Sequence, residues 1–108
     1  GKSITGTGAV TVTGLTATTD LSGVGAGLNV TATVTAATDI SANNNLGTVD
    51  TFQVDAGTLT LTAAQAGGKS ITGTGAVTVT GLTATTDLSG VGAGLNVTAT
   101  VTAATDIS

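Results

Sequence analysis

The chain of 108 residues contains no cysteine, histidine, methionine, proline, tryptophan, tyrosine, glutamate or arginine. Without cysteine, histidine and glutamate, the usual zinc and iron sites, the Ser-His-Asp and Cys-His nucleophiles and a glutamate base are excluded. Two lysines and a single aromatic residue exclude a nucleic-acid-binding surface, and the formal net charge of −4 points the same way. We therefore expect no enzymatic activity, no bound cofactor and no nucleic-acid partner.

Long apolar runs are also missing. No stretch of about 18 apolar residues occurs, so we expect no membrane span. The sequence opens on Gly1-Lys2-Ser3 with neither an initiator methionine nor the pattern of a signal peptide, so we expect it to be an excerpt of a longer chain. A lack of cysteine is compatible with any compartment and is common in bacterial surface proteins.

What the chain does contain is strand-forming residues. Threonine accounts for 27 positions, and valine and isoleucine for another 16. Such β-branched side chains favour strands over helices. With 40% hydrophobic and only 7% charged residues, the composition argues against disorder. It predicts an all-β fold.

An exact internal repeat defines the domain organisation. Residues 1–41 recur without a single change as residues 68–108, an offset of 67. The chain is therefore one complete unit, 1–67, followed by a partial second unit, 68–108. A globular domain does not end part-way through a copy of itself, so we interpret the chain as part of a tandem array.

A weaker repetition is present inside the unit. Three spans, 59–76, 10–29 and 30–58, each begin with strict alternation of an aliphatic residue and threonine, the period-2 pattern of a half-buried strand. The first two spans are similar in length, and a span of about 20 residues suits one coil of a β-solenoid. The third is longer, so we expect it to carry a protrusion or an additional strand through 43–45 and 51–55.

These patterns predict a parallel β-solenoid, or β-helix, with about three coils per 67-residue unit. In a solenoid each coil contacts only its neighbours, so identical units can follow one another without limit. Glycine-rich stretches at 6–8 and 23–27 are expected to supply positive φ angles at the corners. The absence of proline agrees with continuous strand ladders, because proline has no N–H to donate to a neighbouring strand. The alternative is a β-sandwich of the bacterial immunoglobulin-like type.

The alternation also predicts which side chains face the core and which face solvent. The inward set is Val10, Val12, Val30, Val34, Leu59, Leu61, Ile4, Leu21, Leu28, Ile40 and Phe52. The outward set is Thr11, Thr13, Thr31, Thr33, Thr35, Thr58, Thr60 and Thr62. Stacked coils would arrange these threonines about 4.8 Å apart between coils and about 7 Å apart along a strand.

The outward threonine array has two interpretations. As solvated strand residues, the threonines supply β-propensity, methyl contacts and hydroxyl hydrogen bonds between coils. As a functional surface, ranks of T-x-T strands resemble the ice-binding faces of insect and bacterial antifreeze solenoids. We favour the first, because ice binders keep the pattern on every coil whereas the coil length here varies.

Four aspartates occur in the motif T-D-[L/I]-S: Asp20, Asp39, Asp87 and Asp106. An aspartate in a turn accepts a hydrogen bond from the backbone two residues on, here the N–H of Ser22 or Ser41. The alternative is a Ca²⁺ site, because stacked coils could bring Asp20 near Asp39 and a cation would relieve the repulsion of two carboxylates. No D-x-D-x-D-G loop or G-G-x-G-x-D repeat is present.

Two further motifs are interpreted as turns. The tetrapeptide at 67–70, Gly-Gly-Lys-Ser, matches the end of a phosphate-binding loop, but Ala63 occupies the position of its first glycine, and we expect a strand around Ile71 in place of a helix. The three asparagines at 43–45 are expected to form a left-handed turn, since asparagine tolerates that conformation best after glycine.

Taken together, the segments I-T-G-T-G-A-V-T-V-T-G-L, T-D-L-S-G-V and T-L-T-L-T-A-A-Q-A resemble units of very long bacterial β-strand repeat surface proteins. The resemblance implies secretion, β-solenoid stalks, filaments or surface layers, and a role in adhesion or attachment between cells. It implies no catalytic residue.

The expected function is therefore that of a structural protein at the bacterial cell surface or outside the cell. Its expected form is a stiff rod for scaffolding, spacing or adhesion, with self-association into filaments or arrays and contact with a cell surface or matrix. The alternatives are a binding module that uses its threonine array, and an enzyme on a β-helix scaffold such as a polysaccharide lyase. The enzyme is disfavoured because only Lys2, Lys69 and scattered aspartates are available.

Overall fold

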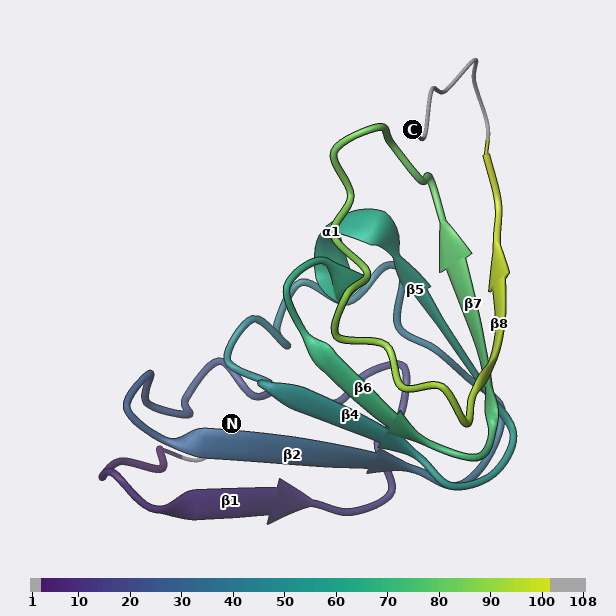
Figure 1. Cartoon of the computed structure of the whole chain (residues 1–108). Coiled ribbons are helices and arrows are strands. Elements are labelled where there is room, and N and C mark those ends of the chain that lie inside the picture. Colours follow the sequence, from purple (N-terminus) through teal and green to yellow (C-terminus); the bar gives the residue numbers. More distant parts are fainter. Residues whose placement is uncertain (1–2, 102–108) are drawn as a thin grey trace.

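The chain winds into a β-solenoid of about five coils, seen in a computed structural model that describes residues 3–101 (Figure 1). Its strands form two four-stranded sheets, which lie on two sides of each coil. Every pair of neighbouring strands in these sheets is parallel. The predicted fold class is confirmed, and the sandwich alternative is wrong because sandwiches are built from antiparallel sheets.

The strands are short, and one helical turn interrupts them. The first sheet consists of β1 (Ala9–Val12), β2 (Asn29–Val34), β4 (Thr51–Val54) and β6 (Ser70–Gly73). The second sheet consists of β3 (Thr38–Asp39), β5 (Thr58–Thr62), β7 (Ala76–Thr80) and β8 (Asn96–Ala99). The helical turn is α1 (Ala63–Ala66).

Register fixes the length of each coil. The shortest coil leads from Thr58 to its partner Ala76, and the longest leads from Thr38 to its partner Leu59, only slightly further along the chain. The single long coil expected over 30–58 is therefore wrong. The additional strand expected near 51–55 does exist as β4, but it is an ordinary rung between β2 and β6 and no protrusion.

The core lies between the two sheets and follows the predicted alternation. Eight of the eleven predicted core residues are buried: Val30, Val34, Leu59, Leu61, Leu21, Leu28, Ile40 and Phe52. Val10 and Val12 are half-buried and pack against that cluster. Burying one such side chain stabilises the fold by about 1.5–3 kcal/mol. The exception is Ile4, which is 37% exposed.

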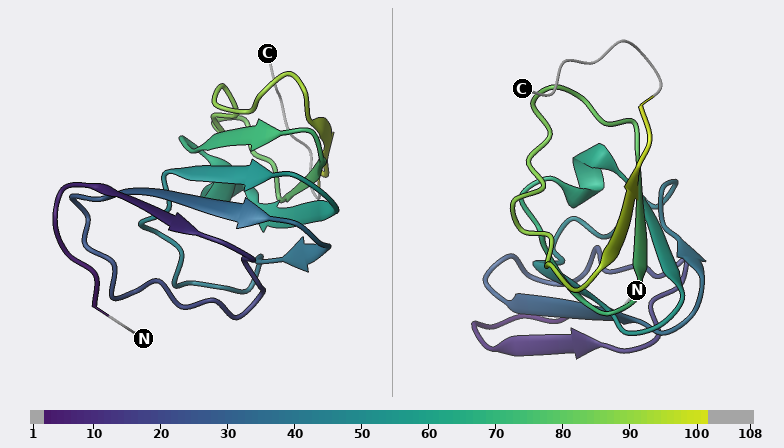
Figure 2. Two further views of the ribbon diagram at one scale, coloured as in Figure 1. Left: turned by 90° about the horizontal axis from the view of Figure 1, so that it is seen from below. Right: turned by 45° about the vertical axis from the view of Figure 1, so that its right-hand side comes forward.

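Irregular segments close the coil beside the two sheets; we call segments 40–50 and 63–69 the third side (Figure 2). Backbone hydrogen bonds join neighbouring coils here too, as between Leu21 N and Asn45 O at 3.0 Å. The helical turn α1 lies on this side, where the sequence pattern predicts no helix. The strand expected around Ile71 is confirmed as β6, which follows Lys69 directly.

Glycines allow the sharp corners, although not at all the expected positions. Gly57 has φ +74°, and a Cβ there would lie 2.7 Å from the backbone nitrogen of Ala37 in the coil below. Gly6 has the expected positive φ of 127°. The prediction is wrong for Gly8 and for the glycines of 23–27, none of which has a positive φ. Gly27 instead lies close to the preceding coil, because a Cβ there would be 3.1 Å from Gly6 O.

Candidate functional surface

Outward side chains of the first sheet form two ladders that run across the coils. The first ladder consists of Thr11 in β1, Thr31 in β2, Thr51 in β4 and Ser70 in β6, each of which is the register partner of the next. Along each strand these residues alternate with inward side chains. A second ladder on the same sheet joins Thr33, Gln53 and Thr72. Neighbouring rungs of a sheet lie about 4.8 Å apart. We call these rows, and the matching rows of the second sheet, the threonine ladders.

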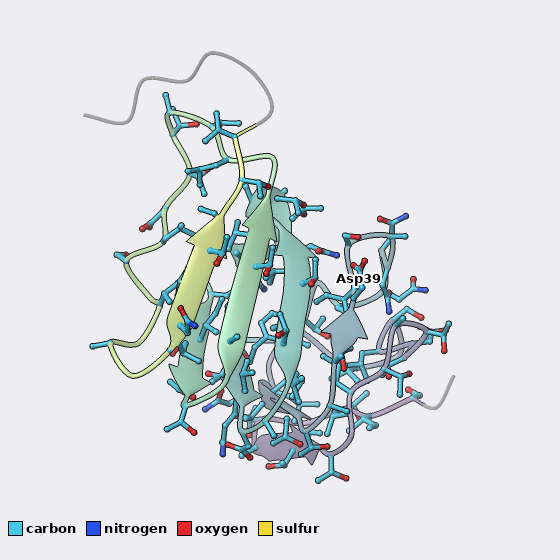
Figure 3. All side chains as sticks on the ribbon, turned by 90° about the vertical axis from the view of Figure 1, so that its right-hand side faces the viewer. Asp39 is labelled. Atoms are coloured by element: carbon cyan, nitrogen blue, oxygen red, sulfur yellow. The ribbon has the colours of Figure 1, made fainter. Side chains whose placement is uncertain are left out.

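The second sheet carries the same arrangement. Asp39, Thr60, Thr78 and Thr98 are successive register partners in β3, β5, β7 and β8. Thr62 and Thr80 form a parallel row further along the strands. Figure 3 looks onto this sheet, with Asp39 on the short strand β3 beside β5.

None of the eight threonines predicted to face outward is buried, but the structure does not bring them onto one surface. The exposed members are Thr11, Thr13 and Thr35, and the half-buried members are Thr31, Thr33, Thr58, Thr60 and Thr62. The first sheet and its edges hold positions 11–35, and β5 in the second sheet holds positions 58–62. The array is therefore divided between two sides of the coil.

Several threonine hydroxyls in the strands and just beyond their ends are engaged in bonds within the fold. The Thr33 hydroxyl donates to Val12 O in the preceding coil at 3.2 Å, and the Thr100 hydroxyl donates to Val79 O in the same way at 3.2 Å. The Thr80 hydroxyl donates to Leu61 O at 3.4 Å. These contacts are the inter-coil hydrogen bonds of the structural interpretation.

The aspartates of the T-D-[L/I]-S motif act within their own turns, as predicted. Asp20 Oδ1 accepts the Ser22 N–H at 2.9 Å, and Asp39 Oδ1 accepts the Ser41 N–H at 2.9 Å and its hydroxyl at 2.6 Å. Asp87 Oδ1 accepts the Ser89 N–H at 2.9 Å, and Asp106 lies outside the described residues. A carboxylate that accepts such bonds is favoured in its charged form.

The same bonds shift the titration of these groups. Hydrogen bonds from the Ser41 side chain and then from its backbone N–H lower the pKa of Asp39 below the ordinary 3.8. Ser22 lowers the pKa of Asp20 and Ser89 lowers the pKa of Asp87 by the same two bonds. The negative charge is thus stabilised by hydrogen bonds of the turn itself.

A Ca²⁺ site would need several oxygen ligands around one point. Within residues 3–101, no group of three or more acidic, histidine or cysteine side chains is placed to hold a metal ion. Asp20 and Asp39 lie in neighbouring coils, and each carboxylate accepts hydrogen bonds from its own turn. No cation is therefore required to explain their placement.

Three polar residues tie the coils together in a role that the sequence did not predict for them. The Val30 N–H donates to Asp50 Oδ2 at 2.9 Å, while Asp50 N donates to Val30 O at the same distance. Asn43 Nδ2 donates to Thr19 O at 2.8 Å, and Gln65 Nε2 donates to Ile40 O at 2.7 Å. Each of these pairs joins one coil to its neighbour.

The sequence held a signal for one of these residues. Thr62-x-x-Gln65 is a capping box: the Thr62 hydroxyl accepts Gln65 N, and Gln65 Oε1 accepts Thr62 N. The asparagine turn was interpreted wrongly, since none of residues 43–45 has a positive φ. Asn43 Oδ1 instead accepts the N–H of Asn45 at 2.8 Å, so the side chain shapes the turn.

A shallow cavity of about 520 Å³ opens on the third side. Its lining includes Asn43, Gln65 and Lys69. These polar groups are engaged by backbone carbonyls, with Lys69 Nζ donating to Gly47 O at 3.0 Å and Gln65 Nε2 to Asn43 O at 2.9 Å. The arrangement holds the turns of this side in place.

Comparison with known proteins gave no match to a family profile, a curated protein or a solved structure. Among residues 3–101, no helix is long and apolar enough to cross a membrane.

Proposed function

We propose that this chain is a structural repeat protein whose tandem units extend one β-solenoid into a stiff rod. The observation that carries the proposal is the junction between the two copies. It is an ordinary ladder between β5 of the first copy and β7 of the second, paired continuously from Thr58↔Ala76 to Thr62↔Thr80. A unit can therefore be added without a linker or a special interface.

The burial of identical residues supports growth by addition. Val30 and Val34 are fully buried beneath the next coil, whereas their copies Val97 and Val101 on the last coil are 38% and 49% exposed. At the other end Ile4 is 37% exposed, while its copy Ile71 is fully buried. Each coil thus completes the core of its neighbour, which is the nearest-neighbour stability of solenoid proteins.

The exposed ends also favour self-association. A free coil end presents unpaired strand edges together with apolar side chains. When such an end contacts the opposite end of another copy, the contact does not close on itself and generates filaments. We therefore propose end-to-end filaments as the assembled form. The resemblance to bacterial β-strand repeat surface proteins supports an extracellular or cell-surface location and a role in scaffolding, spacing or adhesion.

Arrays of two, four and eight units test the rod. With about 4.8 Å per coil, each added unit should lengthen the particle by about 16 Å at constant width. Electron microscopy of single particles, with small-angle scattering for the cross-section, measures both quantities. Thr78→Pro is the control, because proline removes a backbone donor from the junction ladder and should interrupt the rod. Compact particles whose width grows with unit number would overturn the proposal.

The binding module remains the second candidate, because Thr60, Thr78 and Thr98 do form a regular rank on the second sheet. Thermal hysteresis and ice recrystallisation assays at micromolar protein decide between the two. We expect no effect, because the array is split between two sheets and part of its hydroxyls bond to the backbone. A clear effect that Thr78→Val abolishes would establish the binding module.

A further inference from the structure

Identical sequences occupy different sides of the solenoid in the two copies. Strand β1 and its copy β7 share the sequence A-V-T-V, yet β1 belongs to the first sheet and β7 to the second (Figure 1). In the same way β2 belongs to the first sheet and its copy β8 to the second. The pairing within each copy is unchanged, since Val10↔Val30 recurs as Val77↔Val97. The second copy therefore keeps its internal pairing but is rotated as a whole around the solenoid axis relative to the first copy.

Coil lengths explain the displacement. From Leu59 the register passes to Val77 and then to Val97, one coil at each step. Val97 repeats Val30, and in the first copy the chain from Val30 to Leu59 is longer than one coil. The first part of this segment, from Val30 to Thr38, leads from the first sheet to the second. The second part, from Thr38 to its register partner Leu59, makes one full coil. The unit is thus three coils plus one side.

A second residue pair shows the same displacement independently. Ile4 pairs with Val24 in an isolated parallel bridge outside both sheets. The identical pair, Ile71 and Val91, is also bridged, but Ile71 now belongs to β6 in the first sheet. The bridge pair and the strands of the second copy therefore both lie one side further along the coil than the same residues of the first copy.

We propose that the 67-residue period is a screw step that every unit of a tandem array repeats, three coils along the axis and one side around it. This inference rests on the proposed rod, and it adds how the residues of each unit are distributed around the axis of that rod. A given threonine of the unit therefore faces a new direction in each successive unit, so a surface formed by particular residues of the unit winds around the rod.

Spin labels on outward strand positions test the screw step, and the absence of native cysteine makes the labelling specific. In the screw arrangement Thr31 is the register partner of Thr51. If each unit occupied whole coils on one side, Thr31 would neighbour Thr60 instead. The pair Thr60→Cys with Thr78→Cys is the control, because these positions are partners in either arrangement.

We expect strong dipolar broadening for Thr31→Cys with Thr51→Cys and for the control pair, and none for Thr31→Cys with Thr60→Cys. Broadening of the Thr31/Thr60 pair, or its absence from the Thr31/Thr51 pair, would overturn the screw step. Thr33→Cys with Gln53→Cys is a second pair of partners on the same strands, and it decides the question if the first variant misfolds. A whole-coil result would leave linear growth of the rod intact, so the two proposals fail separately.

Discussion

At the scale of single residues, the stability of this protein depends on small groups whose positions are tightly defined. Gly57, Asp20, Asp39 and Asp87 are exposed, yet the glycine forms a sharp corner and each aspartate accepts a hydrogen bond within its own turn. The glycine acts through sterics and the aspartates act through electrostatics, so each can be tested by its own substitution.

Gly57→Ala should destabilise the fold markedly. Its positive φ strains any side chain by about 1–3 kcal/mol, and the added Cβ would also collide with the backbone of Ala36 and Ala37. Urea unfolding measures the loss. Gly47→Ala is the matched control, because nothing lies within 4 Å of its Cβ position and φ is not in the left-handed region. Equal stability of the two variants would contradict the corner geometry.

The aspartate turns should make stability depend on pH in the acidic range. Because Ser41 lowers the folded-state pKa of Asp39, the stabilisation is complete above the unfolded value of about 3.8 and is lost as pH falls through the lower folded value. Asp39→Asn should therefore reduce the difference in urea midpoint between pH 6 and pH 2.5. Asp55→Asn is the comparison, because the Asp55 carboxylate accepts hydrogen bonds from the side-chain amide of Gln53 and not from a turn N–H. An unchanged difference in Asp39→Asn would disprove the role of the turn.

At the scale of elements, short parallel strands alternate with turns that side chains hold in place. The strands follow directly from the aliphatic–threonine alternation, which puts Leu59 and Leu61 inside and Thr60 outside. The one helical turn of the described chain, α1, departs from that pattern where A-A-Q-A offers small helix-forming residues after a capping threonine.

Removing the cap tests this element. Thr62→Val deletes the hydroxyl that accepts Gln65 N and should cost about 0.5–2 kcal/mol of unfolding free energy. Chemical denaturation measures the cost. Thr60→Val is the matched control on the same face of β5, where the substitution keeps the β-branched shape and no helix cap is lost. A loss as large for Thr60→Val would refute the capping role.

At the scale of the whole molecule, the coils stabilise one another in sequence along the axis. The last coil shows what is missing when no coil follows, since Val97 is 38% exposed and its copy Val30 is fully buried. Extending the chain beyond Ser108 by the sequence of residues 42–67 should therefore bury Val97 and Val101.

We expect that extension to raise the urea midpoint and to increase the hydrogen-exchange protection of β8 amides at least tenfold, because about 1.4 kcal/mol of added local stability corresponds to a factor of ten. An extension of the same composition in scrambled order is the control. Equal protection of β8 in the two extended chains would contradict stabilisation by the neighbouring coil.

The amino-acid sequence alone determined the β-solenoid, its repeat unit, the inward aliphatic residues and the aspartate turns, because each depends on local alternation or on a contact between near neighbours in the chain. Only the tertiary structure decided which strands are neighbours. The span 30–58 looks like one long coil, but hydrogen-bond register divides it into a step from the first sheet onto the second and a full coil that ends at Leu59.

Pairing across a coil is a non-local choice in which several alternating segments compete. In the structure β4 lies between β2 and β6, where Phe52 is buried with Ala32 and Ile71 as its register partners. The threonines are therefore outward as the sequence requires, while the side of the rod on which each one lies is a property of the packed coils.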